Sequence, residues 1–168
     1  MADGADTQGE AEALEALHPD AWRWAVRLAH GDRDFAQDIL HDAYLVILDR
    51  RARWQQKASF KTFVFGVIRM TARAQMRKRT LLSIRFPTWQ NEDVPVHRTS
   101  DPVLQGTLTA MSKLPKRQAE IAELVFAQDL TLEEAADIMG ISLGSARTHY
   151  ARAKTKLRDL LGVEDHDV

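Results

Sequence analysis

Apolar residues recur at three- and four-residue spacing along most of the chain, which is the spacing of one face of an α-helix. The first such segment places Ala21, Trp24 and Leu28 on one face. Proline lacks a backbone N–H and suits the first turn of a helix, whereas glycine often follows the last turn. We therefore predict a helix that begins near Pro19 and ends near Gly31.

Two longer periodic segments follow, over residues 32–51 and 59–79, separated by a loop with the sequence ARWQQKA. The apolar residues of the first segment share one face: Phe35, Ile39, Ala43, Val46 and Ile47. Ser59 is a suitable N-cap for the second segment, because its hydroxyl can accept a hydrogen bond from a free backbone N–H. Both segments are predicted to be helices.

Periodicity is lost over residues 81–101, where Pro87 and Pro95 interrupt a run of turn-forming residues. Further helical segments follow, over residues 102–111, 115–128, 132–139 and 143–161. No strand pattern is found. The sequence therefore predicts an all-α protein.

Its organisation is that of two small helical domains joined by a flexible linker. The predicted parts are an acidic N-terminal extension over 1–17, a first domain over 18–80, the linker over 81–101, a second domain over 102–161 and a tail over 162–168.

The last two helical segments form a predicted helix-turn-helix. Thr131 and Glu134 match a capping box, in which each side chain bonds the other residue's backbone N–H. Gly140 suits the left-handed residue that ends a helix, and Ser142 can cap the next one. The second helix carries an apolar stripe that we expect to be buried: Ala146, Tyr150, Ala153, Leu157 and Leu160.

The opposite face of this helix is polar and basic, with Ser145, Arg147, Thr148, His149 and Arg152. In helix-turn-helix proteins the second helix enters the major groove of DNA, where arginine can donate two hydrogen bonds to guanine. Lys156 and other late residues are placed for phosphate contacts. The alternative is an amphipathic helical hairpin with a solvated basic face.

Charge is distributed unevenly, although the 23 basic and 24 acidic residues nearly cancel. Residues 1–50 carry a net charge of −7, residues 51–100 a net charge of +9 and residues 101–168 a net charge of −3. Such asymmetry favours separate partners for separate surfaces, and solvated helix faces are the alternative.

Cysteine content, apolar runs and the N-terminal pattern indicate in which compartment the protein works. The chain has no cysteine, and its apolar runs are too short for a transmembrane helix. The N-terminus lacks the basic and then apolar pattern of a signal peptide. We therefore expect a cytoplasmic protein without membrane insertion.

A carboxylate and histidine metal site in a helical-bundle enzyme is a further alternative, with Asp34, Asp38, His41 and Asp42 as its candidates. A pair of Glu-x-x-His motifs on two other helices, which would complete such a site, does not occur, and His149 has no second ligand at a useful spacing. We therefore expect no metal, no cofactor and no enzymatic activity.

The two halves together resemble the extracytoplasmic-function sigma factors of the sigma-70 family. Residues 32–51 and 59–79 look like the region-two domain, and residues 114–161 look like the region-four domain. The match covers roughly residues 18–80 and 102–161. The resemblance implies an initiation factor that binds core RNA polymerase and promoter DNA, and an anti-sigma factor as a further partner.

The family's acidic polymerase-binding motif appears here as DILHDAY, with His41 in place of the usual glutamine. The resemblance gives a docking role on the polymerase clamp helices to Asp38, Leu40, His41, Asp42 and Tyr44. It assigns the −10 promoter element to residues that follow: Trp54, Lys57, Arg69, Arg73, Arg77 and Lys78. Met70 stands where the family usually has asparagine, and Ala74 and Gln75 replace another commonly polar pair.

Aromatic residues near the predicted −10 surface have two interpretations. Trp54 either packs in the fold or stacks on a flipped base, and Phe60, Phe63 and Phe65 fit a core role better than base stacking. The resemblance assigns the −35 element to Ser145, Arg147, Thr148, His149, Arg152 and Lys156. The alternative function is a stand-alone helix-turn-helix regulator that binds duplex DNA without polymerase.

Overall fold

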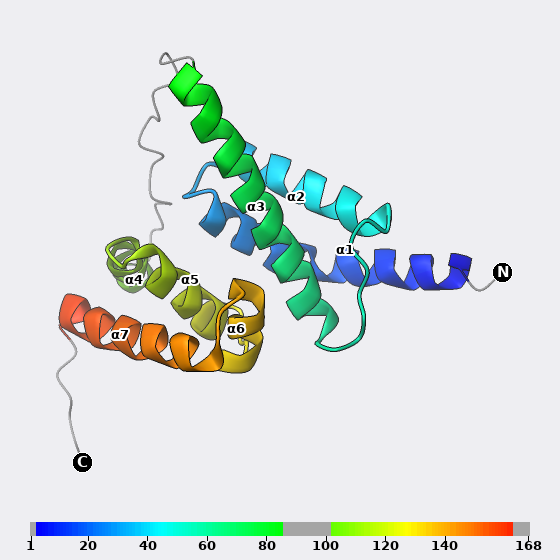
Figure 1. The fold of residues 1–168 in the computed structure, drawn as a ribbon. Coiled ribbons are helices and arrows are strands. Elements are labelled where there is room, and N and C mark those ends of the chain that lie inside the picture. The colour runs from blue at the N-terminus through cyan, green and yellow to red at the C-terminus, as the bar shows by residue number, and fades with distance from the viewer. Residues whose placement is uncertain (1–2, 86–101, 163–168) are drawn as a thin grey trace. The chain divides into compact units, whose positions relative to one another are not determined.

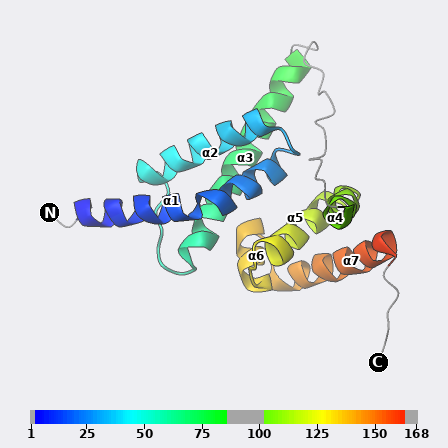
Figure 2. The same cartoon turned by 180° about the vertical axis from the view of Figure 1, so that it is seen from behind.

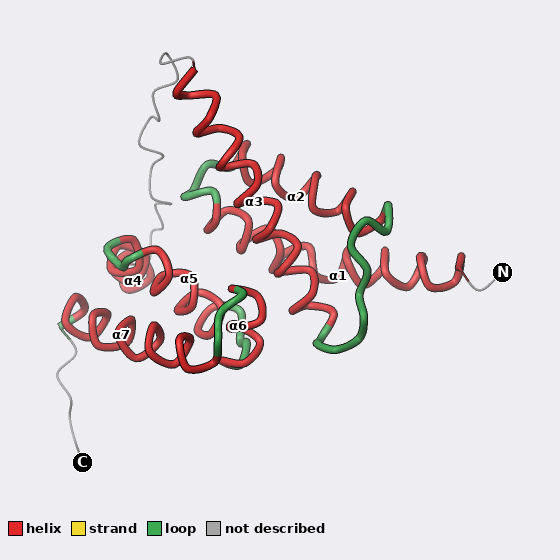
Figure 3. The backbone as a smooth tube through the Cα atoms, in the orientation of Figure 1, coloured by secondary structure: helices red, strands yellow, loops and turns green. Residues whose placement is uncertain are grey.

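The computed structural model describes residues 3–85 and 102–162, and within these residues the chain forms only helices and connecting loops (Figure 3). The chain divides into two compact units, residues 1–94 and 95–168. The predicted all-α class is therefore confirmed. Most of the predicted linker, residues 86–101, lies outside the described residues, while residues 81–85 continue a helix.

The first unit is built from α1 (Asp3–Leu28), α2 (Arg33–Leu48) and α3 (Phe60–Arg85), which all pack on one another (Figure 1). Trp24 and Phe65 are fully buried, and their rings stack with centroids 6.0 Å apart. The indole Nε1 of Trp24 donates a hydrogen bond to the Phe65 carbonyl at 3.3 Å. This contact fastens α1 to α3 at the centre of the unit.

The prediction that the first helix begins at Pro19 is wrong. Helix α1 begins at Asp3 and contains Pro19 in its interior, and its first turns extend past α2 (Figures 1 and 2). Leu14 is buried and Leu17 is half-buried. Both continue the helical spacing of Ala21, so the apolar face of the helix extends on both sides of Pro19. Burial of this face offsets the free-energy cost of the backbone hydrogen bond that proline cannot make.

The second unit contains α4 (Pro102–Ser112), α5 (Lys116–Ala122), η1 (Glu123–Ala127), α6 (Leu132–Met139) and α7 (Leu143–Leu161). Its core joins Met111, Leu114, Ala119 and Ala122 to Ala153 of α7. The predicted continuous helix over 115–128 is instead split, because η1 is a π-helical turn in which the Gln128 N–H donates to the Glu123 carbonyl.

Candidate polymerase and nucleic-acid interfaces

The helix-turn-helix is confirmed by its caps. The Thr131 hydroxyl accepts from the Glu134 N–H at 3.2 Å, and the Glu134 carboxylate accepts from the Thr131 N–H at 3.0 Å. Gly140 has φ of 62°, so it ends α6 in the left-handed conformation. The Ser142 hydroxyl then accepts from the Ser145 N–H at 3.2 Å and begins α7. Local sequence thus sets both the turn and the start of α7.

The apolar stripe of α7 is buried at its centre and opens towards its end. Ala146 and Ala153 are fully buried, and Tyr150 and Leu157 are half-buried. The expectation that Leu160 is buried is wrong, because this side chain is 37% exposed. The last turn of α7 therefore carries less of the packing than its first three turns.

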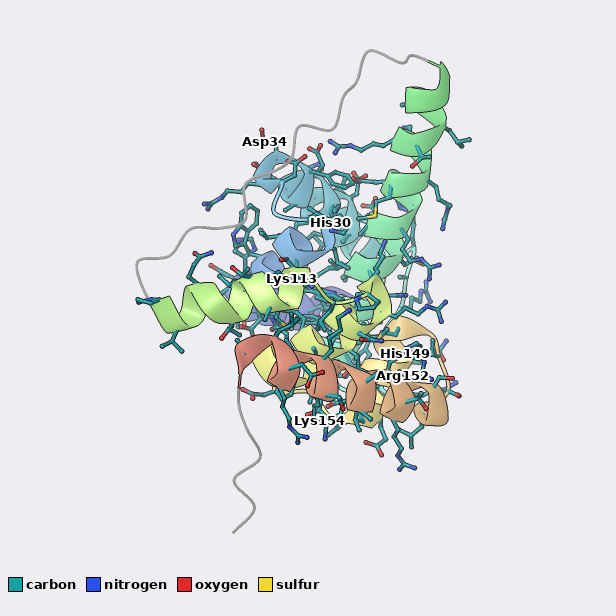
Figure 4. The ribbon with its side chains drawn as sticks, turned by 90° about the vertical axis from the view of Figure 1, so that its left-hand side faces the viewer. His30, Asp34, Lys113, His149, Arg152 and Lys154 are labelled. Atoms are coloured by element: carbon teal, nitrogen blue, oxygen red, sulfur yellow. The ribbon has the colours of Figure 1, made fainter. Side chains whose placement is uncertain are left out.

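The −35 candidates lie along the outside of α7. Ser145, Arg147, Thr148, Arg152 and Lys156 are exposed, and His149 is half-buried. Figure 4 shows His149 and Arg152 in neighbouring turns of this helix. The Thr148 hydroxyl donates to the Gly144 carbonyl at 3.0 Å, so its methyl group and lone pairs remain available to a ligand.

The basic side chains of α7 divide between two flanks of the helix. At about 100° per residue, Arg152 and Lys156 point to one flank, whereas Arg147 and Lys154 point to the other. The Lys154 ammonium lies 4.8 Å from the centroid of the Tyr150 ring, which draws it towards its own helix. Arg147, Arg152 and Lys156 form no ion pair with another described residue, so their charges are open to an anion.

The polymerase-docking candidates of α2 separate into exposed and packed residues. Asp38, His41 and Asp42 are exposed, whereas Leu40 is buried in the core. Tyr44 is half-buried with its hydroxyl 3.0 Å from His18 Nδ1 of α1, and burial raises the pKa of this hydroxyl. Only the first three are placed to meet another molecule.

Two exposed leucines extend the outer face of α2. Leu45 is 38% exposed and Leu48 is 42% exposed, and both lie at helical spacing from Asp38 and His41. The acidic half of this face begins with Asp34, which Figure 4 labels at the start of the helix. These leucines were not predicted to belong to the docking face, although residues 34, 38, 41, 45 and 48 have the spacing of one helical face.

The −10 candidates of α3 also separate. Arg73, Arg77 and Lys78 are exposed and form no ion pair with another described residue. Arg69 is only 8% exposed, so it does not continue their open surface. The spacing of the basic residues did not predict that Arg69 is buried. Arg69 lies on α3 beside the buried apolar residues Val64, Phe65 and Ile68.

The loop before α3 holds Trp54 in a packed position. Its Nε1 donates to the Ala58 carbonyl at 2.9 Å, and its ring meets Phe60 edge-on with centroids 5.2 Å apart. Phe60 in turn lies 6.1 Å from Phe63. Trp54 is half-buried and Lys57 is exposed, so the loop offers both an indole edge and a cation at the surface.

Gln75 of α3 contacts the docking turn of α2. Its Nε2 donates to Asp42 Oδ2 at 2.6 Å and to the Asp38 carbonyl at 3.3 Å. From the sequence alone, Gln75 stood out only as a departure from the family pattern. A contact between residues 33 positions apart gives no signal in local spacing.

The described parts of the chain, residues 3–85 and 102–162, contain no cluster of three metal-ligating side chains. Among the helices of those same parts, none combines the length and the apolar character that crossing a bilayer requires.

The comparisons with known proteins agree with this layout. Residues 13–81 match the family model of sigma-70 region 2, and residues 104–157 match that of sigma-70 region 4. The chain is 28% identical over 157 residues to the ECF RNA polymerase sigma factor EcfG of Rhodopseudomonas palustris, covering 89% of this chain and 83% of the relative. It is 29% identical over 171 residues to the ECF RNA polymerase sigma factor ShbA of Streptomyces griseus, covering 92% and 88%.

The fold is similar to that of the sigma factor RpoE of Bartonella quintana, which was solved in complex with the anti-sigma factor NepR. The TM-score is 0.79 at 25% identity, and the match covers 92% of this chain and 97% of that one. Both sigma regions are thus present in the expected order, in a family whose members carry no enzymatic activity. The chain belongs to the extracytoplasmic-function RNA polymerase sigma factors of the sigma-70 family.

Proposed function

We propose that this sigma factor works in the cytoplasm by dividing three contacts among three helices. Helix α2 docks on core RNA polymerase, α3 and the loop before it contact the −10 element, and α7 reads the −35 element. The observation that carries the proposal is the separation of charge in the first unit. The exposed carboxylates Asp34, Asp38 and Asp42 lie along α2, whereas Arg73, Arg77 and Lys78, which are exposed and form no ion pair with another described residue, lie along α3.

The docking face of α2 has two chemically different halves. Asp34, Asp38 and Asp42 give its first half a negative charge, and Leu45 and Leu48 give its second half an apolar surface. A partner that fits this face has basic side chains beside an apolar ridge. Charge complementarity would speed and orient the association, and the leucines would supply buried apolar area.

The −10 contact rests on Arg73, Arg77 and Lys78. Successive exposed cations along one helix suit a phosphate backbone, to which they contribute affinity without reading sequence. Met70 is 55% exposed and Ala74 is also exposed on this helix, so the direct base contacts available there are apolar. An apolar contact favours the methyl group of thymine over the polar edge of cytosine.

The −35 contact rests on the early and central residues of α7. Ser145, Thr148 and Arg152 would reach base edges in the major groove, and Arg147 and Lys156 would hold the flanking phosphates. The sequence-dependent part of binding therefore depends on few side chains, whereas the salt-dependent part is shared by the cations.

An anti-sigma factor is the regulatory partner that we propose. The Bartonella quintana structure holds its sigma factor with the anti-sigma factor NepR, and the present chain matches that fold over nearly its whole length. An anti-sigma factor acting on this chain would compete with core polymerase if it covers the α2 face.

Run-off transcription with purified core polymerase on genomic fragments tests the proposal. The sigma factor should produce discrete transcripts that core enzyme alone does not make. A stand-alone helix-turn-helix regulator would instead bind duplex DNA tightly without core and produce no transcripts. Binding of the free chain to the selected promoters, measured in parallel, separates the two functions.

A further inference from the structure

The amide of Gln75 is fully used as a donor. It has two N–H groups, and its nitrogen contacts two oxygens of α2, Oδ2 of Asp42 at 2.6 Å and the carbonyl of Asp38 at 3.3 Å. Both oxygens belong to the single helical turn that carries the exposed docking candidates. The amide therefore binds both the backbone of this turn and one of its carboxylates.

This contact fixes a side chain that would otherwise rotate. Asp42 is exposed, and an exposed aspartate samples several rotamers at little cost. A charge-assisted hydrogen bond of 2.6 Å holds Oδ2 towards α3 and leaves Oδ1 for another donor. A carboxylate that is already oriented loses less conformational freedom when a partner binds it.

We propose that Gln75 is a positioning residue for polymerase docking, acting through Asp42. The inference rests on the proposed docking role of α2 and adds to it a residue of α3, the helix assigned to promoter DNA. Gln75 thus joins the polymerase-binding helix to the DNA-binding helix by side-chain hydrogen bonds.

The test is a double-mutant cycle on the affinity for core polymerase, measured without DNA so that promoter contacts do not enter. The variants of the full chain are Gln75→Ala, Asp42→Ala and the double variant. We expect Gln75→Ala to weaken core binding about threefold to tenfold, which is the net contribution of a typical single hydrogen bond. In the Asp42→Ala background the same change should cost less than about twofold.

Gln55→Ala is the matched control, since Gln55 is an exposed glutamine in the loop before α3, outside the α2 face, and the assay contains no DNA. It should leave the affinity unchanged. Circular dichroism and melting of each variant establish that the unit is folded. Gln75→Glu places a second carboxylate against Asp42, so it should weaken binding more than Gln75→Ala does.

Equal losses for Gln75→Ala in both backgrounds would overturn the proposal, because a general structural role needs no Asp42. An unchanged affinity for Gln75→Ala would overturn it as well. If Asp42→Ala alone has no effect, the docking role of that carboxylate fails together with the positioning role. That single variant distinguishes the two failures.

Discussion

The guanidinium of Arg79 lies over the face of Phe35, with 3.7 Å between its central carbon and the ring centroid. Its Nη1 is also 3.5 Å from Oδ2 of Asp32, whose other oxygen accepts from the Phe35 N–H and caps α2. Arg79 of α3 therefore packs against the start of α2. Although Arg79 belongs to the basic run of the sequence, its contacts stabilise the first unit.

Replacing Arg79 by alanine should therefore destabilise the first unit by about 0.5–1 kcal/mol, the range for an exposed cation–π contact. Denaturation followed by tryptophan fluorescence reports on this unit, because Trp22, Trp24 and Trp54 lie within it. Arg77→Ala is the control and should leave the stability unchanged. An equal loss for both variants would show that the contact with Phe35 contributes nothing.

The ion pair between Asp20 of α1 and Lys61 of α3 predicts a pH dependence. Their atoms are 2.9 Å apart, and the Lys61 hydrogen bond holds the pKa of the Asp20 carboxyl below its ordinary value. A lowered pKa stabilises the fold above the pKa of the unfolded chain, and this stabilisation is lost as the pH falls through the folded pKa.

Asp20→Asn should therefore be less stable than the wild type at neutral pH, by up to about 1 kcal/mol for a partly exposed pair. The difference should begin to shrink as the pH falls below about 4, the ordinary pKa of an aspartate, and should disappear once the pH is below the lowered pKa of the folded Asp20 carboxyl. Asp49→Asn removes the more exposed pair with Arg51 and serves as the control, with no expected difference at either pH. A deficit of Asp20→Asn that persists in acid would contradict the assignment to the charged carboxylate.

Two glycines of the helix-turn-helix should respond oppositely to alanine. Gly140 has φ of 62°, where a side chain is strained, so Gly140→Ala should destabilise the second unit by about 1–2 kcal/mol. Gly144 lies inside α7 with its nearest neighbour 4.0 Å from an added Cβ, so Gly144→Ala should stabilise the helix by about 0.5–1 kcal/mol. Hydrogen exchange of α6 and α7 measures both changes. Losses of similar size would refute the role given to the turn.

The proposed division of labour on α7 predicts two kinds of DNA defect. Arg152→Ala should cost about 1–3 kcal/mol on the preferred −35 duplex and little on a scrambled one. Lys156→Ala should weaken both duplexes similarly and reduce the salt slope by about one unit. Binding of reconstituted holoenzyme across a salt series checks both. If Arg152→Ala weakens both duplexes equally, this side chain does not read bases.

The sequence predicted helix bounds most accurately where capping residues mark the ends of the helix. The bounds of α6 and α7 agree with the structure because Thr131, Gly140 and Ser142 cap them through bonds to residues at most three or four positions away. The start of α1 was missed because Pro19 is a strong local signal that the apolar face of Leu14 overrides.

The candidate sites show the same division between local and distant determinants. The exposed face of α7 follows from its spacing, which a single helix determines. The burial of Arg69 and the bonds from Gln75 to α2 depend on how α3 packs against another helix, and no spacing within α3 records that. The same holds for Leu40, whose place in a motif did not reveal that it lies in the core.

The proposed function depends most on docking of the acidic turn of α2 on core polymerase. The most direct measurement is the equilibrium affinity of the full chain for core enzyme after Asp38→Lys and Asp42→Lys are combined. Glu12→Lys combined with Glu15→Lys is the control, because both glutamates are exposed on α1 and the change in charge is the same. We expect a loss of affinity of at least about tenfold for the α2 variant and of less than about twofold for the control. Equal affinities of the two folded variants would contradict it.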